Sequence, residues 1–274
     1  MAFKKILIHA DSSAACDHRV RLAMRLAKQQ LAELASVYIV PDYFLPTYYE
    51  AQISPEIIER SDRLAREKAQ KAQNHYQREA TEAGMSMNVH IEQGSLISKL
   101  CTYARYADLL VLGQSNPDDP DNMSEALADN LVLEGGVPCL VVPEAEPVES
   151  IGERVLVAWN ASRESARALR DSLPILMQAE RVVLLSAGSE SDDEREDRIS
   201  ISNYLALNGI NAELRVESGN GAPPGETIVS SASAMNADLI VMGAYGHSRL
   251  RELVLGGATR HLLHNMPVPI FISH

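Results

Sequence analysis

Glycines gather at two places near the end of the chain, in the stretch LIVMGAYGHSRLRELVLGG (239–257). Gly243 and Gly246 follow an apolar run typical of a buried strand, and Gly256 and Gly257 come after nine further residues. Glycines let a ligand approach the main-chain amides closely. The following ATRHLL favours a helix start, whose free N–H groups and positive dipole end attract anions. The spacing therefore predicts a phosphate-binding cradle.

The hydroxyl of Thr259 is an additional donor for a phosphate, and Arg249 could pair with a terminal phosphate, although an exposed polar loop explains Arg249 equally well. Neither a P-loop nor the dinucleotide fingerprint after the first strand is present. The expected contacts in and around the cradle are Met242, Gly243, Gly246, His247, Arg249, Gly256, Gly257, Ala258 and Thr259.

Catalytic and metal chemistry find little support in the sequence. His247 and Ser248 are adjacent, which does not suit a catalytic pair, and no nucleophile turn, general base or lysine is placed to make turnover fast. We therefore expect slow ATP hydrolysis at most. His261 and His264 lie three apart on a predicted helix, but further ligands are not close in sequence, so we expect surface histidines and no metal site.

Composition excludes several classes of partner. The formal net charge of −12 over 274 residues repels phosphate backbones, so we expect no nucleic-acid partner. The apolar run at the N-terminus is too short for a signal peptide, and no run is long enough to span a membrane. Three separated cysteines, Cys16, Cys101 and Cys139, are typical of reduced, buried side chains. We expect a cytoplasmic protein without membrane contact.

The chain repeats itself, which predicts a duplicated domain. Four segments recur in the same order: 4–13 with 153–162, 84–94 with 209–219, 107–116 with 237–246, and 137–142 with 268–273. A polar, proline-containing stretch (143–153) separates the copies. We expect one domain over residues 1–145 and a second over residues 152–274.

Each copy alternates strand and helix patterns. Continuous apolar strands alternating with helices predict an α/β fold with parallel, doubly wound sheets, whose ligands bind outside the carboxyl ends of the strands. Predicted strands are 4–10, 36–40, 86–92, 108–113 and 138–142, then 154–159, 181–186, 212–217, 238–243 and 269–273. Predicted helices of the first copy are 14–33, 55–83, 95–105 and 124–134; Ser54 and Pro55 begin the second, and Gly84 and Gly209 end helices.

The pattern Gly-x2-Gly-x9-Gly after ADLIVMG, with the ending MPVPIFIS, resembles the universal stress protein family across nearly all of both copies. The resemblance implies two tandem domains, each with a five-stranded sheet in the order 3-2-1-4-5, and pairing of the domains through their last strands within one molecule. It also implies an adenine nucleotide, ATP with Mg²⁺, beside the tip of the first strand, where the second copy has Asn160.

Departures from the family pattern separate the two copies. Gly257 stands where the family usually has Ser or Thr, and Asn160 where it usually has Asp, although an amide can still bond a sugar hydroxyl. The first copy keeps Asp11 but lacks the cradle, so we expect nucleotide binding only in the second copy. After Gly113, the first copy has Asn116, Glu125 and Ala126 where the second copy has glycines. The negative charges of Asp118, Asp119 and Asp121 in the same segment also repel phosphate.

Two interpretations of function remain open. The first is a stress-response protein that binds ATP in its second domain and acts through conformation or an unidentified protein partner. The alternative is a scaffold without nucleotide, or a protein binding a small apolar ligand near the aromatic-rich segment 41–62, which also reads as an ordered loop. A third, weaker interpretation is an ATP-cleaving ligase of related fold, but residues 160–165 do not supply the loop that such a ligase needs after the first strand. Intramolecular pairing leaves room for a dimer of tandem chains without requiring one.

Overall fold

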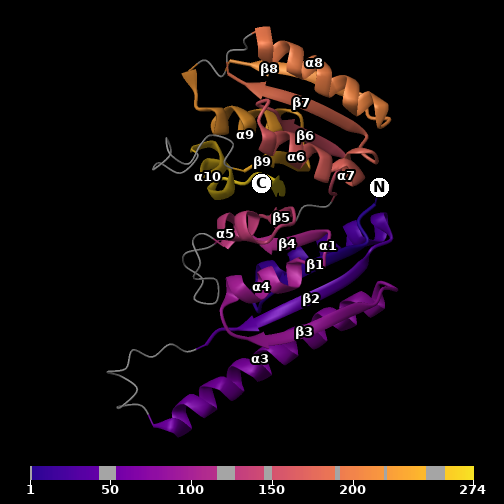
Figure 1. The fold of residues 1–274 in the computed structure, drawn as a ribbon. Helices are drawn as coiled ribbons and strands as arrows, with labels where there is room; N and C mark the ends of the chain where they lie inside the picture. Colours follow the sequence, from indigo (N-terminus) through magenta and orange to yellow (C-terminus); the bar gives the residue numbers. More distant parts are fainter. Residues whose placement is uncertain are drawn as a thin grey trace.

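The two halves of the chain build one continuous sheet of ten strands (Figure 1). This computed structural model describes residues 2–42, 54–115, 127–144, 150–188, 192–218, 221–244 and 257–274. The first half contains β1 (Lys5–Ala10), α1 (Ala14–Gln30), β2 (Glu33–Val40), α3 (Pro55–Glu82), β3 (Met87–Gln93), α4 (Leu96–Ala104), β4 (Leu109–Gly113), α5 (Leu127–Glu134) and β5 (Cys139–Val142). The second half contains β6 (Arg154–Ala158), α6 (Arg163–Asp171), α7 (Leu173–Leu176), β7 (Arg181–Ala187), α8 (Asp192–Leu207), β8 (Ala212–Glu217), α9 (Pro224–Ala234), β9 (Leu239–Gly243), α10 (Gly257–His264) and β10 (Ile270–Ser273).

Strand order confirms the predicted duplication. The sheet runs β3-β2-β1-β4-β5-β10-β9-β6-β7-β8, so each half has the order 3-2-1-4-5 with parallel neighbours. The halves meet where β5 and β10 pair antiparallel, with Ile270 opposite Val141 and Ile272 opposite Cys139. The expected pairing through the last strands therefore occurs within one chain.

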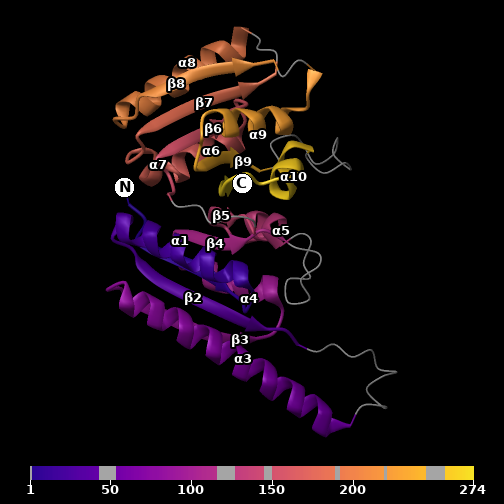
Figure 2. The same cartoon turned by 180° about the vertical axis from the view of Figure 1, so that it is seen from behind.

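Alternate residues of each strand supply the cores on the two faces of the sheet. On β6, Val155 and Val157 join the cluster that packs against α1, α3, α6 and α8, whereas Leu156 joins the cluster beneath α4, α5, α9 and α10. Figure 1 shows α4 in front of the sheet, and the reverse view in Figure 2 shows α1 there. Burial on both faces explains why the strands read as continuous apolar runs.

Side chains add to the contact between the halves. The rings of Phe3 and Phe271 stack with centroids 6.4 Å apart. Gln30 donates from Nε2 to the carbonyl of Pro174 at 3.0 Å. Gln114, the residue after β4, donates from Nε2 to the carbonyls of Leu263 (3.0 Å) and His264 (3.1 Å) at the end of α10.

The predicted helix 14–33 was too long, because α1 ends at Gln30 and β2 already begins at Glu33. Leu31 adopts a left-handed conformation (φ 55°), and the N–H of Ala32 donates to the carbonyl of Ala27 at 2.9 Å, which closes the helix. A non-glycine residue in this conformation leaves no sequence signal. The predicted strand 36–40 correspondingly starts three residues too late, whereas the other predicted strand ends agree with the structure to within about one residue.

Several local predictions are confirmed. Gly84 and Gly209 follow α3 and α8 with φ of 72° and 77°. Pro55 opens α3 after Ser54, although the Ser54 side chain makes no capping bond. All three cysteines are free and buried, and burial raises the pKa of the Cys139 thiol. Within the described ranges, no helix is both long and apolar enough to cross a membrane.

Candidate functional site

The candidate site lies at the carboxyl ends of β6 and β9, which are neighbours in the sheet. The strand order reverses between them, because the chain continues from β6 to β7 on one side and from β9 to β10 on the other. Ligands of open α/β sheets bind at such a reversal. Six predicted contacts belong to the described residues: Asn160, Met242, Gly243, Gly257, Ala258 and Thr259. Gly246, His247, Arg249 and Gly256 lie outside them.

Asn160 sits in a tight turn between β6 and α6. Its Oδ1 accepts from the N–H of Ser162 (3.2 Å) and from the Ser162 hydroxyl (2.7 Å). Ser162 then caps α6, its Oγ accepting from the N–H of Ser165 at 3.1 Å. Ala161 between them has φ of 56°, a left-handed conformation that is costly for alanine. The turn holds the Asn160 side chain at the exposed rim of the sheet.

Gly243 ends β9, as predicted. Its lack of a side chain, however, serves the packing of a helix and not the approach of a phosphate. A Cβ at this position would overlap the backbone of Glu164 and Ser165 in the first turn of α6. The bare backbone therefore allows α6 to pack directly on the end of β9. A ligand approaching Gly243 from that side would meet α6, so Gly243 does not open the site in the way that the spacing suggests.

A helix is present where the sequence predicted one after the second pair of glycines, because α10 covers Gly257–His264, with Gly257 as its first described residue. Gly257 is exposed, and a Cβ placed on it would meet no atom of the described residues within 4 Å. Ala258 is half-buried, whereas the side chains of Thr259 and Met242 are only 5% exposed. The open feature of the predicted cradle is therefore the main chain at the start of α10, while Met242 packs in the core.

The matching place in the first half is filled by the protein itself. Asp11 repeats the turn of Asn160, accepting at Oδ1 from the Ser13 N–H (2.8 Å) and hydroxyl (2.5 Å). Its Oδ2 accepts from Nη2 of Arg19 at 2.5 Å, and both side chains are buried. A Cβ on Gly113 would overlap the Arg19 guanidinium. Arg19 therefore occupies the space between the tips of β1 and β4.

Electrostatics support a permanent ion pair at this place. Burial raises the pKa of Asp11, but the charge of Arg19 together with the neighbouring His9 and the hydrogen bonds from Ser13 and Arg19 outweighs it and holds that pKa well below its usual range. Burial and the Arg19 charge lower the pKa of neighbouring His9 to about 4. Tyr76 of α3 donates its hydroxyl to the Asp11 carbonyl at 3.0 Å. The cluster is ionised at Asp11 and neutral at His9 near pH 7.

Sequence reasoning missed Arg19, although a signal was present. Arg19 falls on the buried face of α1, in step with Cys16, Ala23 and Ala27, where a charge is unexpected. The aligned position of the second half, found by adding the offset of 149 between segments 4–13 and 153–162, is the apolar Ala168. A lone charge on an apolar helix face, together with Asp11 nearby, was the available sign of a buried ion pair.

Comparison with known proteins agrees with this architecture. The model of the universal stress protein family matches residues 2–143 and 174–274. The chain belongs to the universal stress protein family.

Individual relatives of this universal stress protein are distant. A universal stress protein of Synechocystis is 26% identical over 136 residues, which span 48% of this chain and only 45% of that relative. A crystal structure of a universal stress protein from Archaeoglobus fulgidus matches 98% of this chain and 97% of its own, with a TM-score of 0.75 at 18% identity. A Pseudomonas aeruginosa protein matches 99% and 92%, with a TM-score of 0.60 at 15% identity. These structural likenesses show the fold.

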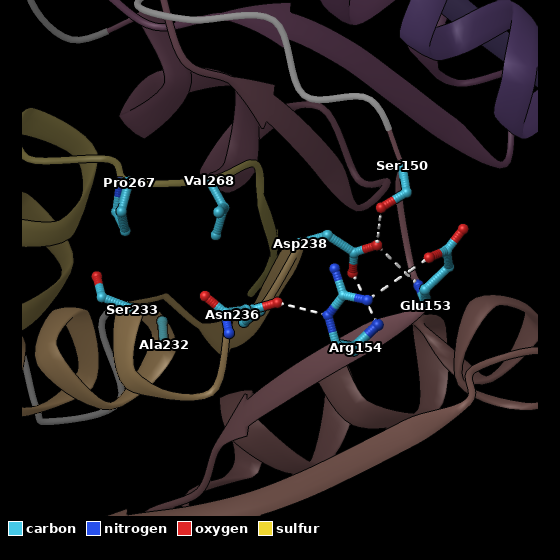
Figure 3. Close-up of a pocket in the computed structure, with 10 residues that line it drawn as sticks. Ser150, Glu153, Arg154, Ala232, Ser233, Asn236, Asp238, Pro267 and Val268 are labelled. Carbon is cyan, nitrogen blue, oxygen red and sulfur yellow. Dashed lines mark hydrogen bonds and ion pairs between the residues drawn. The ribbon is translucent and has the colours of Figure 1, made fainter.

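A cavity of about 660 Å³ lies elsewhere in this universal stress protein, at the amino ends of β6 and β9. Figure 3 shows Pro267 and Val268 facing Ala232 and Ser233 across it, with Asp238 at its inner end. Ligands of parallel sheets bind at the opposite, carboxyl ends, so this cavity is not the predicted site.

Asp238 has a structural task in this cavity. Its Oδ1 accepts from the N–H groups of Gly152 (3.2 Å) and Arg154 (2.9 Å), and its Oδ2 from the Ser150 hydroxyl (2.7 Å) and the Glu153 N–H (3.0 Å). The carboxylate therefore ties the start of β6 to β9, and its lone pairs are not available to a ligand.

A second hollow, of about 470 Å³, lies beyond the end of β8. Glu217 and Glu226 line it, so their charge disfavours a phosphate there. His261 packs against Gly225 of α9. Among the described residues, no group of three or more His, Cys, Asp or Glu side chains is placed to hold a metal ion.

Proposed function

We propose that this universal stress protein binds ATP or a related adenine nucleotide in its second half and acts through nucleotide-dependent conformation or partner binding. The observation that carries the proposal is the open start of α10 at Gly257, beside the strand reversal that also presents Asn160. Free N–H groups and the dipole at a helix start favour a phosphate.

The arrangement of strands suggests how the nucleotide lies. A phosphate at the start of α10 is on the β9 side of the reversal, so the ribose falls toward Asn160 at the tip of β6 and the base toward β7. Gly246, His247, Arg249 and Gly256 belong to the proposed phosphate contacts on sequence grounds. Mg²⁺ would arrive with the phosphates, because it usually keeps several waters and few protein ligands.

The first half is not proposed as a nucleotide site. Arg19 fills the space between Asp11 and Gly113, and removing it would leave the buried Asp11 carboxylate uncompensated. We therefore propose different roles for the two halves: the second binds the nucleotide, whereas the strand tip of the first is closed by its own ion pair.

Calorimetric titration with ATP and Mg²⁺ tests the proposal. Gly257→Asp places a carboxylate at the start of α10, where it meets no atom of the described residues and suits the helix dipole, so we expect the fold to be retained while phosphate is repelled. Ser95→Asp, at the start of α4, is the matched control. We expect binding by the parent and by Ser95→Asp and its loss in Gly257→Asp.

Trp159 provides an independent optical signal. It is the only tryptophan, is 6% exposed, and precedes Asn160 directly. A nucleotide over the tip of β6 should change its emission in the same concentration range as the heat signal. If neither signal responds to any adenine nucleotide, the protein is better described as a scaffold that works through its surfaces.

A further inference from the structure

We propose that Asn160, helped by Arg163, selects adenine nucleotides whose ribose carries a second phosphate over those with a free ribose diol. This inference rests on the nucleotide site proposed above and specifies the chemical class of its ligand. It follows from the orientation of one amide group and from a comparison of the two strand tips.

The orientation of the Asn160 amide is fixed by its partners. The N–H of Ser162 can only donate, so the atom facing it must be Oδ1, which also accepts from the Ser162 hydroxyl. The amide nitrogen Nδ2 consequently points away from the turn, and no partner for it is found in the described part of the chain. Asn160 thus offers donors, and no free acceptor, to a ligand at this rim.

The first half shows the opposite polarity in the same turn. Asp11 uses Oδ1 for Ser13 in the same way, and its second atom, Oδ2, is an anionic acceptor that holds the Arg19 cation. A carboxylate in this position suits the hydroxyl donors of a ribose diol. An amide N–H suits an acceptor instead, and a phosphate oxygen accepts more strongly than a neutral hydroxyl because the bond is charge-assisted.

Arg163 follows Asn160 by three residues and offers an exposed guanidinium. It is the first residue of α6, and its side chain is 83% exposed. Its Nε and Nη2 both contact one oxygen of Glu164, at 2.8 and 2.6 Å, and the Glu164 carboxylate is itself buried. The guanidinium is therefore the outer member of the pair, and its remaining N–H groups can meet a phosphate. The aligned residue of the first half is Ala14.

Distances along the sheet are compatible with this assignment. Neighbouring strands are about 4.8 Å apart, so a phosphate at the β9 side and a ribose over β6 lie one strand spacing from each other. With the ribose in this place, we expect its 2′- and 3′-oxygens to face the exposed rim where Asn160 and Arg163 follow β6. A phosphate on either the 2′- or the 3′-oxygen offers the acceptors that the N–H groups of Asn160 and Arg163 would bind.

The test compares AMP with adenosine 3′,5′-bisphosphate and adenosine 2′,5′-bisphosphate, measured by calorimetry on the full chain. These ligands differ by one phosphate. We expect at least one bisphosphate to bind about 10-fold more tightly than AMP, in line with one or two charge-assisted bonds. The bisphosphate that binds more tightly than AMP shows whether the 2′- or the 3′-oxygen faces Asn160.

Point variants test which residues cause the preference for a bisphosphate over AMP. Asn160→Asp keeps the turn, as Asp11 shows, but replaces the donor with a negative charge, so the preference for a bisphosphate over AMP should disappear or reverse. Arg163→Ala should reduce the gain several-fold and leave AMP unchanged. Arg167→Ala, which removes an exposed arginine one turn further along α6, is the charge-matched control and should behave as the parent.

The outcomes separate this inference from the proposed site. Equal affinity for AMP and both bisphosphates, or an unchanged ratio in Asn160→Asp, overturns the inference and leaves the nucleotide site standing. Absence of binding by AMP, ATP and both bisphosphates overturns both.

Discussion

Arg19 Nη2 lies 2.5 Å from Asp11 Oδ2 inside the first half, and the aligned residues of the second half are Ala168 and Asn160. The first half therefore holds a buried ion pair at two positions that carry no charge in the second half. This difference between the two strand tips leads to the first prediction.

Arg19→Ala should destabilise the protein by about 3–5 kcal/mol, because it leaves the Asp11 carboxylate buried without a partner. Urea unfolding at pH 7 measures the change. The double variant Arg19→Met with Asp11→Asn removes both charges and keeps much of the volume, so it should be clearly more stable than Arg19→Ala. A loss below about 1 kcal/mol for Arg19→Ala would show that the pair is not buried as described.

Stability should depend on pH through His9. Burial and the charge of Arg19 lower the pKa of His9 from 6.5 in the unfolded chain to about 4 in the folded protein. The unfolded chain thus binds a proton first as the pH falls, so stability is full above pH 6.5 and declines toward pH 4. The decline should reach about 3 kcal/mol at most.

Urea midpoints between pH 4 and pH 7 check the His9 prediction. His9→Asn cannot take up the proton and should lose this part of the slope. The Asp11 pKa is also lowered, so its stabilisation declines only below its ordinary value of 3.8, outside this window. A slope that persists in His9→Asn would assign the effect to another group.

Gly243→Ala should destabilise the protein by about 2 kcal/mol or more, because the added Cβ meets the backbone of α6, which cannot turn aside as a side chain can. Gly209→Ala is the control, since its Cβ meets nothing and its cost is only that of a positive φ, about 1 kcal/mol. Thermal unfolding ranks the two. Equal losses of stability in the two variants would mean that α6 does not pack closely against the end of β9.

Asp238→Asn should cost about 2–4 kcal/mol, because each carboxylate oxygen accepts from two donors and the new NH₂ group would face donors. Asp108 is the aligned residue in the first half, where Oδ2 alone accepts, from the N–H groups of Lys4 (2.7 Å) and Lys5 (3.0 Å). An amide oxygen can replace Oδ2, so Asp108→Asn should lose less than about 1 kcal/mol. Chemical denaturation of both variants measures the contrast.

Much of the fold could be predicted because its signals are local. The strands are buried on both faces, so each reads as a continuous apolar run, and aligned segments such as 107–116 and 237–246 mark the two copies. The end of α1 could not be predicted, because the left-handed conformation that ends it falls on Leu31, a residue type that gives no signal of a helix end.

The elements around the candidate site were predictable, although the site itself stays a prediction. The sequence indicated a strand that ends at Gly243 and a helix near Gly257, and the structure contains both. Whether a glycine admits a ligand or a neighbouring helix depends on what packs against it, as α6 packs on Gly243. The partner of Asp11 is eight residues away along α1, and spacing alone did not reveal that contact.

The antiparallel contact of β5 with β10 has an evolutionary consequence. Two identical subunits joined through such strands must acquire every substitution twice, once on each side of the symmetry axis. Fusion into one polypeptide removes that constraint. Gln114 can then bond to α10 from one side only, with Ala244 in the reciprocal position, and Arg19 can fill the strand tip of one half while Asn160 stays exposed at the tip of the other.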